Sequence, residues 1–238
     1  MEPGDDEPGR QALLRPVEIE AGSREPAHPE KDAGSRFLLG CGDPIMESLV
    51  RRIGPLDHAS RRRGRPDDAY GALVRTIVGQ QLSTKAARTI YGRLVALFGD
   101  APPTPEEILS ADEDTLRAVG LSRQKTGYLR DLAAHVRSGE LDFATLHDLS
   151  DEEVSDRVVA VKGLGRWSAD MFLMFHLRRP DVLPVGDLGI RRAVEKAYGL
   201  PELPDADALR SLAGPWRPHR TLACLYLWES LDNVPDPA

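Results

Sequence analysis

The sequence contains little cysteine and no long apolar segment. Two cysteines, Cys41 and Cys224, occur among the 238 residues, too few for the disulfide framework of a small secreted protein. The longest apolar runs are far shorter than the ~20 residues that cross a membrane. Residues 1–7 lack the basic region and apolar core of a secretory signal. These absences predict an intracellular protein without membrane contact, in which Cys224 is a small buried thiol.

Alternating apolar and polar residues, the pattern of β-strands, are also scarce. Helix start signals follow one another instead, at Asp43-Pro44, Ser83, Thr104-Pro105, Asp112 and Ser122. Stop signals match them: Gly54 ends the first helix, and Gly139 lies near the end of the last. The helix expected over 84–98 has one apolar face, formed by Ala87, Ile90, Leu94 and Leu97. We therefore expect an all-α body.

Most of the net negative charge lies near the N-terminus. Residues 1–35 contain nine acidic and four basic residues, a net charge of −5 out of −7 for the chain, so −2 remains for the rest. This segment is rich in Pro and Gly without apolar periodicity, and we expect a disordered acidic tail. Basic residues of the body are clustered, most densely at Arg61, Arg62, Arg63 and Arg65. A small basic footprint on a mildly acidic body is typical of an enzyme that must release nucleic acid.

The most informative segment is Val161–Asp170, with the sequence VKGLGRWSAD. A capping box of Ser150 and Glu153 predicts a helix before it that stops at Gly163. Glycines at 163 and 165 allow backbone conformations closed to other residues and leave a phosphate free access to peptide N–H groups. A second helix over 166–177 would direct its positive end at that phosphate. The pattern indicates a helix-hairpin-helix that binds a nucleic-acid backbone; a tight structural turn is the alternative interpretation.

Three further segments occur with the hairpin in a characteristic order and spacing. They are Ile77–Ser83 (IVGQQLS), Leu116–Lys125 (LRAVGLSRQK) and Trp216–Thr221 (WRPHRT). With them, residues 40–232 resemble the helix-hairpin-helix DNA glycosylases, specifically the 3-methyladenine DNA glycosylase II family in a compact form without an N-terminal β domain. The resemblance implies a module over 36–238 with a DNA-binding cleft between two helical lobes. One lobe would span about 68–178, and the other 36–67 plus 179–238.

The resemblance assigns the catalytic role to Asp187, twenty residues after Trp167. Without the resemblance, the better interpretation of Asp187 is that it forms the N-cap of a helix that runs to about Tyr198. Both roles are compatible, because a helix N-terminus favours the ionised carboxylate. A fixed anion stabilises the positive charge that develops on the sugar when an N-glycosidic bond breaks, and it can orient or deprotonate the attacking water.

The residue at position 167 indicates the reaction subclass. Bifunctional members of the superfamily carry a lysine near the start of the second hairpin helix, which forms a Schiff base and cuts the strand. Trp167 cannot do so. The four-cysteine iron–sulfur cluster of other branches is also missing. The resemblance therefore implies a monofunctional glycosylase that needs no catalytic cofactor, excises alkylated purines such as 3-methyladenine and 7-methylguanine, and leaves an abasic site.

Three residues match the positions that line the base pocket in relatives: Trp167, Trp228 and Met171. An indole face attracts a cationic alkylated purine, a contact worth roughly 0.5 to 2 kcal/mol. Met171 replaces a tyrosine of some relatives, so narrow substrate predictions do not carry over. For Trp216 and Tyr226 we expect core packing instead.

The resemblance also implies the DNA contacts. The hairpin residues Lys162, Gly163, Leu164, Gly165 and Arg166 would hold the backbone of double-stranded DNA. Gln81 or Leu82 would enter the minor groove as a wedge; an ordinary loop with Leu82 buried is the alternative. In relatives the hairpin carbonyls bind an alkali cation, which assigns the backbone oxygens of Val159, Val161 and Leu164.

We expect a monomer. Two other functions remain open from the sequence: a non-catalytic protein that binds abasic or alkylated DNA through the same hairpin, and a DNA-binding scaffold that anchors a partner. Asp187 argues against the first, and a tryptophan-lined pocket argues against the second.

Overall fold

The computed structural model describes residues 29–56 and 68–232, and within these ranges the chain is helical with no strand. The α-helices are α1 (Pro29–Leu38), α2 (Pro44–Ile53), α3 (Ala69–Gly79), α4 (Thr84–Leu97), α5 (Pro105–Ser110), α6 (Glu113–Ala118), α7 (Arg123–Ser138), α8 (Asp151–Ala160), α9 (Arg166–Phe175), α10 (Leu188–Tyr198), α11 (Ala206–Leu212) and α12 (Arg220–Asp232). Two short 3-10 helices, η1 (Leu146–Asp148) and η2 (Gly214–Trp216), complete the described part. The all-α prediction is confirmed. Of the helices described, none is both long and apolar enough to span a membrane.

The helix starts follow the predicted caps. Thr104 and Ser150 both form complete capping boxes, each with the glutamate three residues later. The side chains of Ser83 and Ser122 accept backbone hydrogen bonds at the starts of α4 and α7. These contacts satisfy N–H groups that have no partner inside the helix, which is why local sequence fixes the starts so well.

Two expectations for individual helices are wrong. The helix before the hairpin ends at Ala160, three residues before Gly163. Within α4, Leu94 is buried, whereas Leu97 is 39% exposed and does not extend the predicted apolar face. The reason is that α4 lies at the edge of the molecule and packs mainly against α3.

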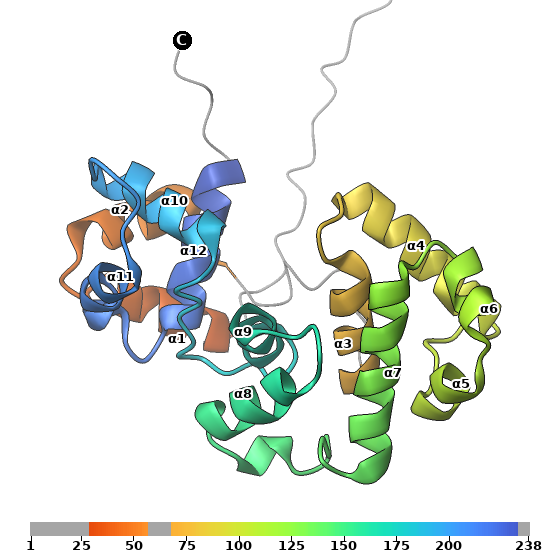
Figure 1. Ribbon diagram of the computed structural model, residues 1–238. Coiled ribbons are helices and arrows are strands. Elements are labelled where there is room, and N and C mark those ends of the chain that lie inside the picture. Colours follow the sequence, from red (N-terminus) through yellow and green to blue (C-terminus); the bar gives the residue numbers. More distant parts are fainter. Residues whose placement is uncertain (1–28, 57–67, 233–238) are drawn as a thin grey trace, which may run out of the picture.

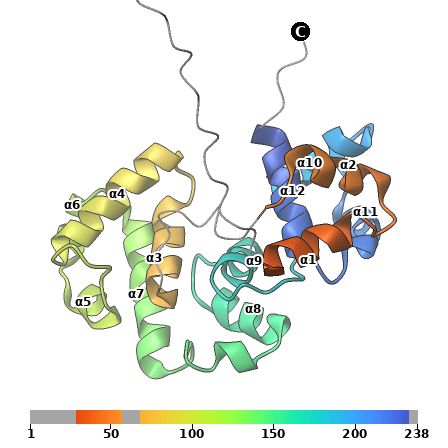
Figure 2. The same cartoon turned by 180° about the vertical axis from the view of Figure 1, so that it is seen from behind.

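The helices form two groups, which Figure 1 shows side by side and Figure 2 shows from behind. Lobe one comprises α3–α9, held together by the contacts of α7 with α3, α5 and α6 and of α9 with α3 and α8. Lobe two comprises α1, α2 and α10–α12, with α12 in contact with α1, α2 and α10. Helix α9 lies where the two lobes meet, and the ring of Phe175 on α9 stacks on Trp228 of α12 with centroids 6.0 Å apart.

Helix α1 corrects the predicted boundary of the disordered tail. It begins at Pro29, inside the segment 1–35 that was expected to lack structure. Its contacts with the rest of lobe two include a buried glycine, Gly34, Ser35, which hydrogen bonds to the Tyr226 hydroxyl at 2.8 Å, the Phe37 ring, 5.0 Å from that of His219, and the buried Leu38. Two of these contact residues are small or polar, so apolar periodicity is weak and the sequence pattern missed this helix. The rest of the predicted tail, and the cluster Arg61–Arg65, lie outside the described residues.

The core of lobe two contains both aromatic residues expected there. Trp216 and Tyr226 are completely buried, as is the Cys224 thiol, and these predictions are confirmed. The Trp216 indole N–H donates to Asp43 at 2.8 Å. The Tyr226 hydroxyl donates to the carbonyl of Gly54 at 3.0 Å.

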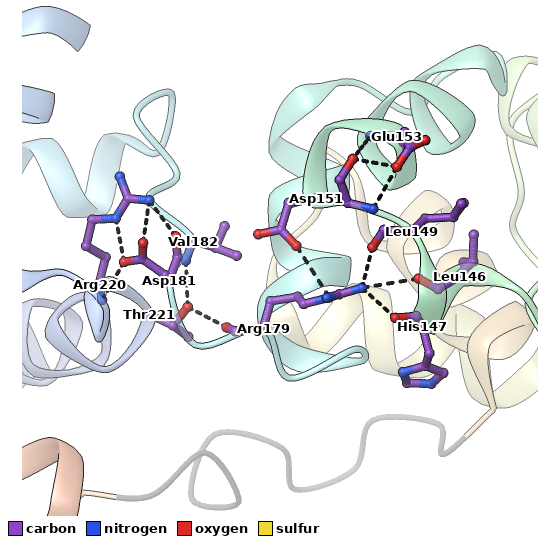
Figure 3. Close-up of polar contacts among 11 residues, drawn as sticks. Leu146, His147, Leu149, Asp151, Glu153, Arg179, Asp181, Val182, Arg220 and Thr221 are labelled. Atoms are coloured by element: carbon purple, nitrogen blue, oxygen red, sulfur yellow. Dashed lines mark hydrogen bonds and ion pairs between the residues drawn. The ribbon is translucent and has the colours of Figure 1, made fainter.

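The segment between α9 and α10 is fastened to both lobes (Figure 3). The Arg179 guanidinium enters lobe one, where it donates to the carbonyls of Leu146, His147 and Leu149. The Arg179 carbonyl accepts from Thr221 of α12 at 2.7 Å. Two residues on, Asp181 accepts from the Arg220 guanidinium at 2.7 and 3.0 Å. This segment leads to Asp187, so its double attachment fixes where Asp187 lies relative to lobe one.

Candidate nucleic-acid interface and catalytic carboxylate

The turn between α8 and α9 has the backbone geometry of a phosphate-binding hairpin. Gly163 has φ +83°, in the region that favours glycine, and a Cβ there would collide with the Tyr128 ring. Gly165 is the N-cap of α9; no side chain caps this helix, and the space around Gly165 is open. The first N–H groups of α9 are therefore free of a capping side chain, and an anion suits them. Leu164 is buried, so only its backbone is available to DNA.

The two basic residues of the hairpin are both paired with acids. The Lys162 Nζ lies 3.1 Å from Asp131 Oδ1, although 78% of the lysine side chain is exposed. Burial raises the pKa of Asp131, but hydrogen bonds and charge from Lys162 outweigh it and leave that pKa below its ordinary value. The Arg166 guanidinium donates to both oxygens of Glu152, at 2.8 and 2.9 Å. Within the described ranges, the hairpin thus presents backbone N–H groups more than unpaired cations.

Arg166 has a second acidic neighbour in Asp170, at 3.5 Å. Burial raises the pKa of Asp170 to about 6, and the charge and hydrogen bond of Arg166 offset only part of that rise. Asp170 lies on α9 one turn after Arg166, facing away from solvent. The pairings of Arg166 make it a link between α8 and α9.

The turn after α3 presents the two predicted wedge residues to solvent. Gln81 has φ +57°, a left-handed conformation that few residues other than glycine adopt. Leu82 is 38% exposed, so the alternative of a buried Leu82 in an ordinary loop is wrong. The preceding Gln80 donates from Nε2 to the carbonyl of Gly163 at 2.7 Å. This bond joins the predicted wedge directly to the hairpin.

Asp187 is the N-cap of α10, as the sequence predicted, and more donors converge on it than a cap requires. Its Oδ1 accepts from the backbone N–H of Ile190 at 2.8 Å and from the Trp228 indole N–H at 3.1 Å. Its Oδ2 accepts from the Trp167 indole N–H at 2.7 Å. Hydrogen bonds to both oxygens fix the orientation of this side chain. The structure thus brings together three predicted site residues that are far apart in sequence.

A cavity of about 610 Å³ lies between α3, α4 and α9, next to this carboxylate. Its walls combine aromatic and aliphatic side chains of α9 with polar and basic side chains of α3, α4 and the turn between them. The lining residues are Ala72, Arg75, Thr76, Gly79, Gln80, Gln81, Leu82, Thr84, Ala87, Arg88, Trp167, Met171, Phe172, Phe175 and His176. Asp187 is not among the lining residues, but Trp167 both lines the cavity and donates a hydrogen bond to Asp187.

The predicted pocket residues are placed differently from one another. Trp167 and Met171 line the cavity, whereas Trp228 lies behind its wall, stacked on the lining residue Phe175. Sequence reasoning missed Phe175, although the spacing 167, 171, 175 places it on the same face of α9. It also missed His176, whose ring stacks on Phe172 with centroids 4.9 Å apart.

The three carbonyls assigned to a cation lie around the end of α8. Because the helix ends at Ala160, the carbonyl of Val159 is among those left without an N–H partner inside the helix. The Val161 carbonyl accepts from the N–H of Leu164 at 3.1 Å. A helix C-terminus carries partial negative charge, which favours a cation nearby.

These features are typical of a helix-hairpin-helix protein of the base excision class: the hairpin has open N–H groups, a pocket lies beside it, and Trp167 links this pocket to the Asp187 carboxylate. Comparison with known proteins supports this class. The profile of the HhH-GPD superfamily, base excision DNA repair proteins, matches residues 74–218. DNA-3-methyladenine glycosylase 1 of Schizosaccharomyces pombe is 34% identical over 190 residues, 79% of this chain and 82% of that protein.

Two solved structures are similar over most of their length. The complex of S. pombe 3-methyladenine DNA glycosylase with abasic DNA has a TM-score of 0.76 and 32% identity, and the match covers 86% of this chain and 98% of that one. DNA-3-methyladenine glycosidase of Bacillus halodurans has a TM-score of 0.75 and 36% identity, over 85% and 91% of the two chains. The chain belongs to the HhH-GPD superfamily of base excision DNA repair proteins, and the family prediction is confirmed.

Proposed function

We propose that this protein is a monofunctional DNA glycosylase that hydrolytically excises alkylated purines, such as 3-methyladenine and 7-methylguanine, and leaves an abasic site. The observation that carries the proposal is the Asp187 carboxylate, oriented by two indole N–H groups, one of which belongs to the pocket residue Trp167. A protein that only bound damaged DNA, or that only anchored a partner, would not need this arrangement. The names of the similar glycosylases support the choice of substrate.

The steps before bond cleavage, which are DNA binding, base flipping and base binding, involve different residues. The open N–H groups of α9 hold a phosphate of the damaged strand, and Gln81 or Leu82 fills the space left in the duplex when the base is flipped out, a step that costs a few kcal/mol. The base enters the cavity beside Trp167, whose ring attracts its positive charge. That charge already makes the base a good leaving group, so no general acid is required.

Asp187 then acts on the sugar. Its carboxylate stabilises the positive charge that develops on the sugar as the glycosidic bond breaks, and it orients or deprotonates the water that attacks. The fixed donors hold the anion in place before the reaction begins, so little reorganisation is needed at the transition state. Because Trp167 has no amine, no Schiff base forms at that position.

We also propose that the carbonyls of Val159, Val161 and Leu164 hold an alkali cation, which would add positive charge beside the bound phosphate. Catalysis itself requires no cofactor in this scheme. The protein would act as a monomer on double-stranded DNA inside the cell, in the cytoplasm if it is bacterial.

The proposal is tested by incubating the protein with methylated duplex DNA and identifying the released bases by mass spectrometry. We expect Asp187→Asn to lower the excision rate by at least about 10²-fold, in the range typical for loss of a transition-state stabiliser. Affinity for DNA with an abasic-site analogue should change little, because the variant keeps the shape of the side chain.

A matched control is Asp205→Asn, since Asp205 also N-caps a helix, α11, through two backbone N–H groups. Asparagine caps helices as well as aspartate does, so this variant should excise normally. Borohydride should trap no enzyme–DNA adduct, and strands should break only after alkali or heat. Normal excision by Asp187→Asn, or no base release by the wild type, would contradict the proposal.

A further inference from the structure

Lys125, on α7, makes a partly buried contact that the proposed mechanism does not use. Its Nζ donates to the carbonyls of Val78 and Gln80, at 2.8 Å each. Burial lowers the pKa of this ammonium group. Both carbonyls belong to the C-terminal end of α3, where carbonyls lack partners inside the helix and a positive charge is favoured by the helix dipole.

The turn that follows α3 is weakly held by its own backbone. The N–H of Gln80 reaches the carbonyl of Ile77 at 3.4 Å, and that of Leu82 reaches Gly79 at 3.3 Å, both long for such bonds. Between them, Gln81 adopts a left-handed conformation that is unfavourable for a residue with a side chain. Contacts from outside the turn are therefore needed to keep the exposed Gln81 and Leu82 in one conformation.

The same face of α7 also supports the hairpin. One turn after Lys125, the Tyr128 ring packs against Gly163. One turn further, Asp131 accepts from the backbone N–H of Lys162 at 2.8 Å. A single helix face thus contacts both DNA-facing loops, and the bond from Gln80 to the Gly163 carbonyl closes the connection between them.

We propose that Lys125 is a positioning residue for the opening of a base pair. Through the carbonyls of Val78 and Gln80 it keeps the Gln81–Leu82 turn in a fixed position relative to the hairpin, so that phosphate binding and wedge insertion occur together. This inference rests on the proposed function. Its distinguishing consequence is that Lys125 matters when the enzyme must open a base pair, and matters little when the damaged base is already unpaired.

The test compares single-turnover excision of one alkylated purine in two DNAs, a fully paired duplex and a duplex with the lesion in an unpaired bubble. Lys125→Met keeps the length of the side chain and removes its donors. We expect it to lose at least tenfold in rate on the paired duplex and less than about twofold on the bubble. Lys196→Met removes an exposed lysine of α10 in lobe two, and it should match the wild type on both DNAs.

A second variant guards against misfolding of the first. Gln80→Leu removes the other external contact of the turn and leaves the Lys125 ammonium intact, and we expect the same selective loss on paired DNA. An equal loss on both DNAs, or no loss on either, would overturn the inference.

Fluorescence of 2-aminopurine placed beside a paired purine nucleotide with a non-hydrolysable glycosidic bond reports base flipping without any excision. It should rise with the wild type and fail to rise with Lys125→Met. If the wild type released no base while the fluorescence difference persisted, the proposed excision would be wrong and the role of Lys125 would stand. Normal fluorescence with Lys125→Met would reject that role even if excision by the wild type is confirmed.

Discussion

Replacing Gly189 by alanine should slow excision by disturbing the Asp187 carboxylate. Gly189 lies in the first turn of α10, beside this carboxylate. A Cβ at this position would lie 3.0 Å from Asp187 Oδ1, 3.1 Å from Trp228 Nε1 and 3.3 Å from Trp228 Cδ1. All three distances are tighter than ordinary van der Waals contacts. Because Ile190 also holds Oδ1, we expect the indole to give way, and its hydrogen bond to the carboxylate to lengthen or break.

The size of the effect follows from the bond that is lost. A hydrogen bond to a charged group contributes about 1.5 to 3 kcal/mol. At about 1.4 kcal/mol per factor of ten, excision should slow by at most roughly 10- to 100-fold, because the bond also exists before the reaction and only the part of its energy that acts in the transition state changes the rate. The lost bond should also lower stability, and the preference of a helix for alanine over glycine, up to about 1 kcal/mol, offsets only part of that loss.

Gly186→Ala provides the matched control. Gly186 immediately precedes Asp187, and a Cβ there would meet no atom within 4 Å. Single-turnover excision and thermal unfolding should be measured for both variants. A double-mutant cycle with Trp228→Phe should be strongly non-additive, because both changes remove the same hydrogen bond. If Gly189→Ala excised as fast as Gly186→Ala, the Trp228 contact would have no part in catalysis.

Two further changes test the hairpin and its buried acid. Gly165→Asp and Gly165→Ser both add a capping side chain to α9, in open space, so neither should destabilise the fold. In a gel-shift assay, aspartate should weaken binding to every duplex because it repels the phosphate, whereas serine should weaken binding much less. Equal binding by the two variants would show that no phosphate lies there. Burial raises the pKa of Asp170 to about 6 from 3.8, so the folded state binds a proton between about pH 4 and 6 that the unfolded state does not, and stability from this group falls as pH rises through that range. Asp170→Asn removes this pH dependence. In urea denaturation, the free energy of unfolding of the variant should rise by about 3 kcal/mol relative to that of the wild type between about pH 4 and pH 7. A difference between the two proteins that stays constant across that range would contradict the assignment.

The local signals of the sequence predicted the helix starts and the hairpin, because caps and glycines act within a few residues. The capping box of Ser150 and the N-cap role of Asp187 are examples. Helix α1 could not be predicted in this way. Its buried face includes Gly34 and Ser35, and their burial depends on α12, which is almost two hundred residues away in the sequence.

The partners of the site residues could not be predicted either. The family resemblance assigned Arg166 to DNA, but a salt bridge to Glu152 depends on how α8 and α9 cross. Trp228 was expected to line the pocket, and the structure instead places it on Asp187 and behind Phe175. Phe175 itself was within reach of sequence analysis, because helical periodicity links it to Trp167 and Met171.

The hairpin of this chain, whose net charge is −7, offers little unpaired positive charge to DNA. Lys162 and Arg166 fasten the hairpin to α7 and α8, and in the proposed function the phosphate is bound by the oriented N–H groups at the start of α9. Cations paired with protein acids release few DNA counterions, so this contact adds little salt-dependent, non-specific affinity. Specificity then rests on geometry: a duplex is held productively only where a base can leave the stack, pass the wedge and reach Asp187.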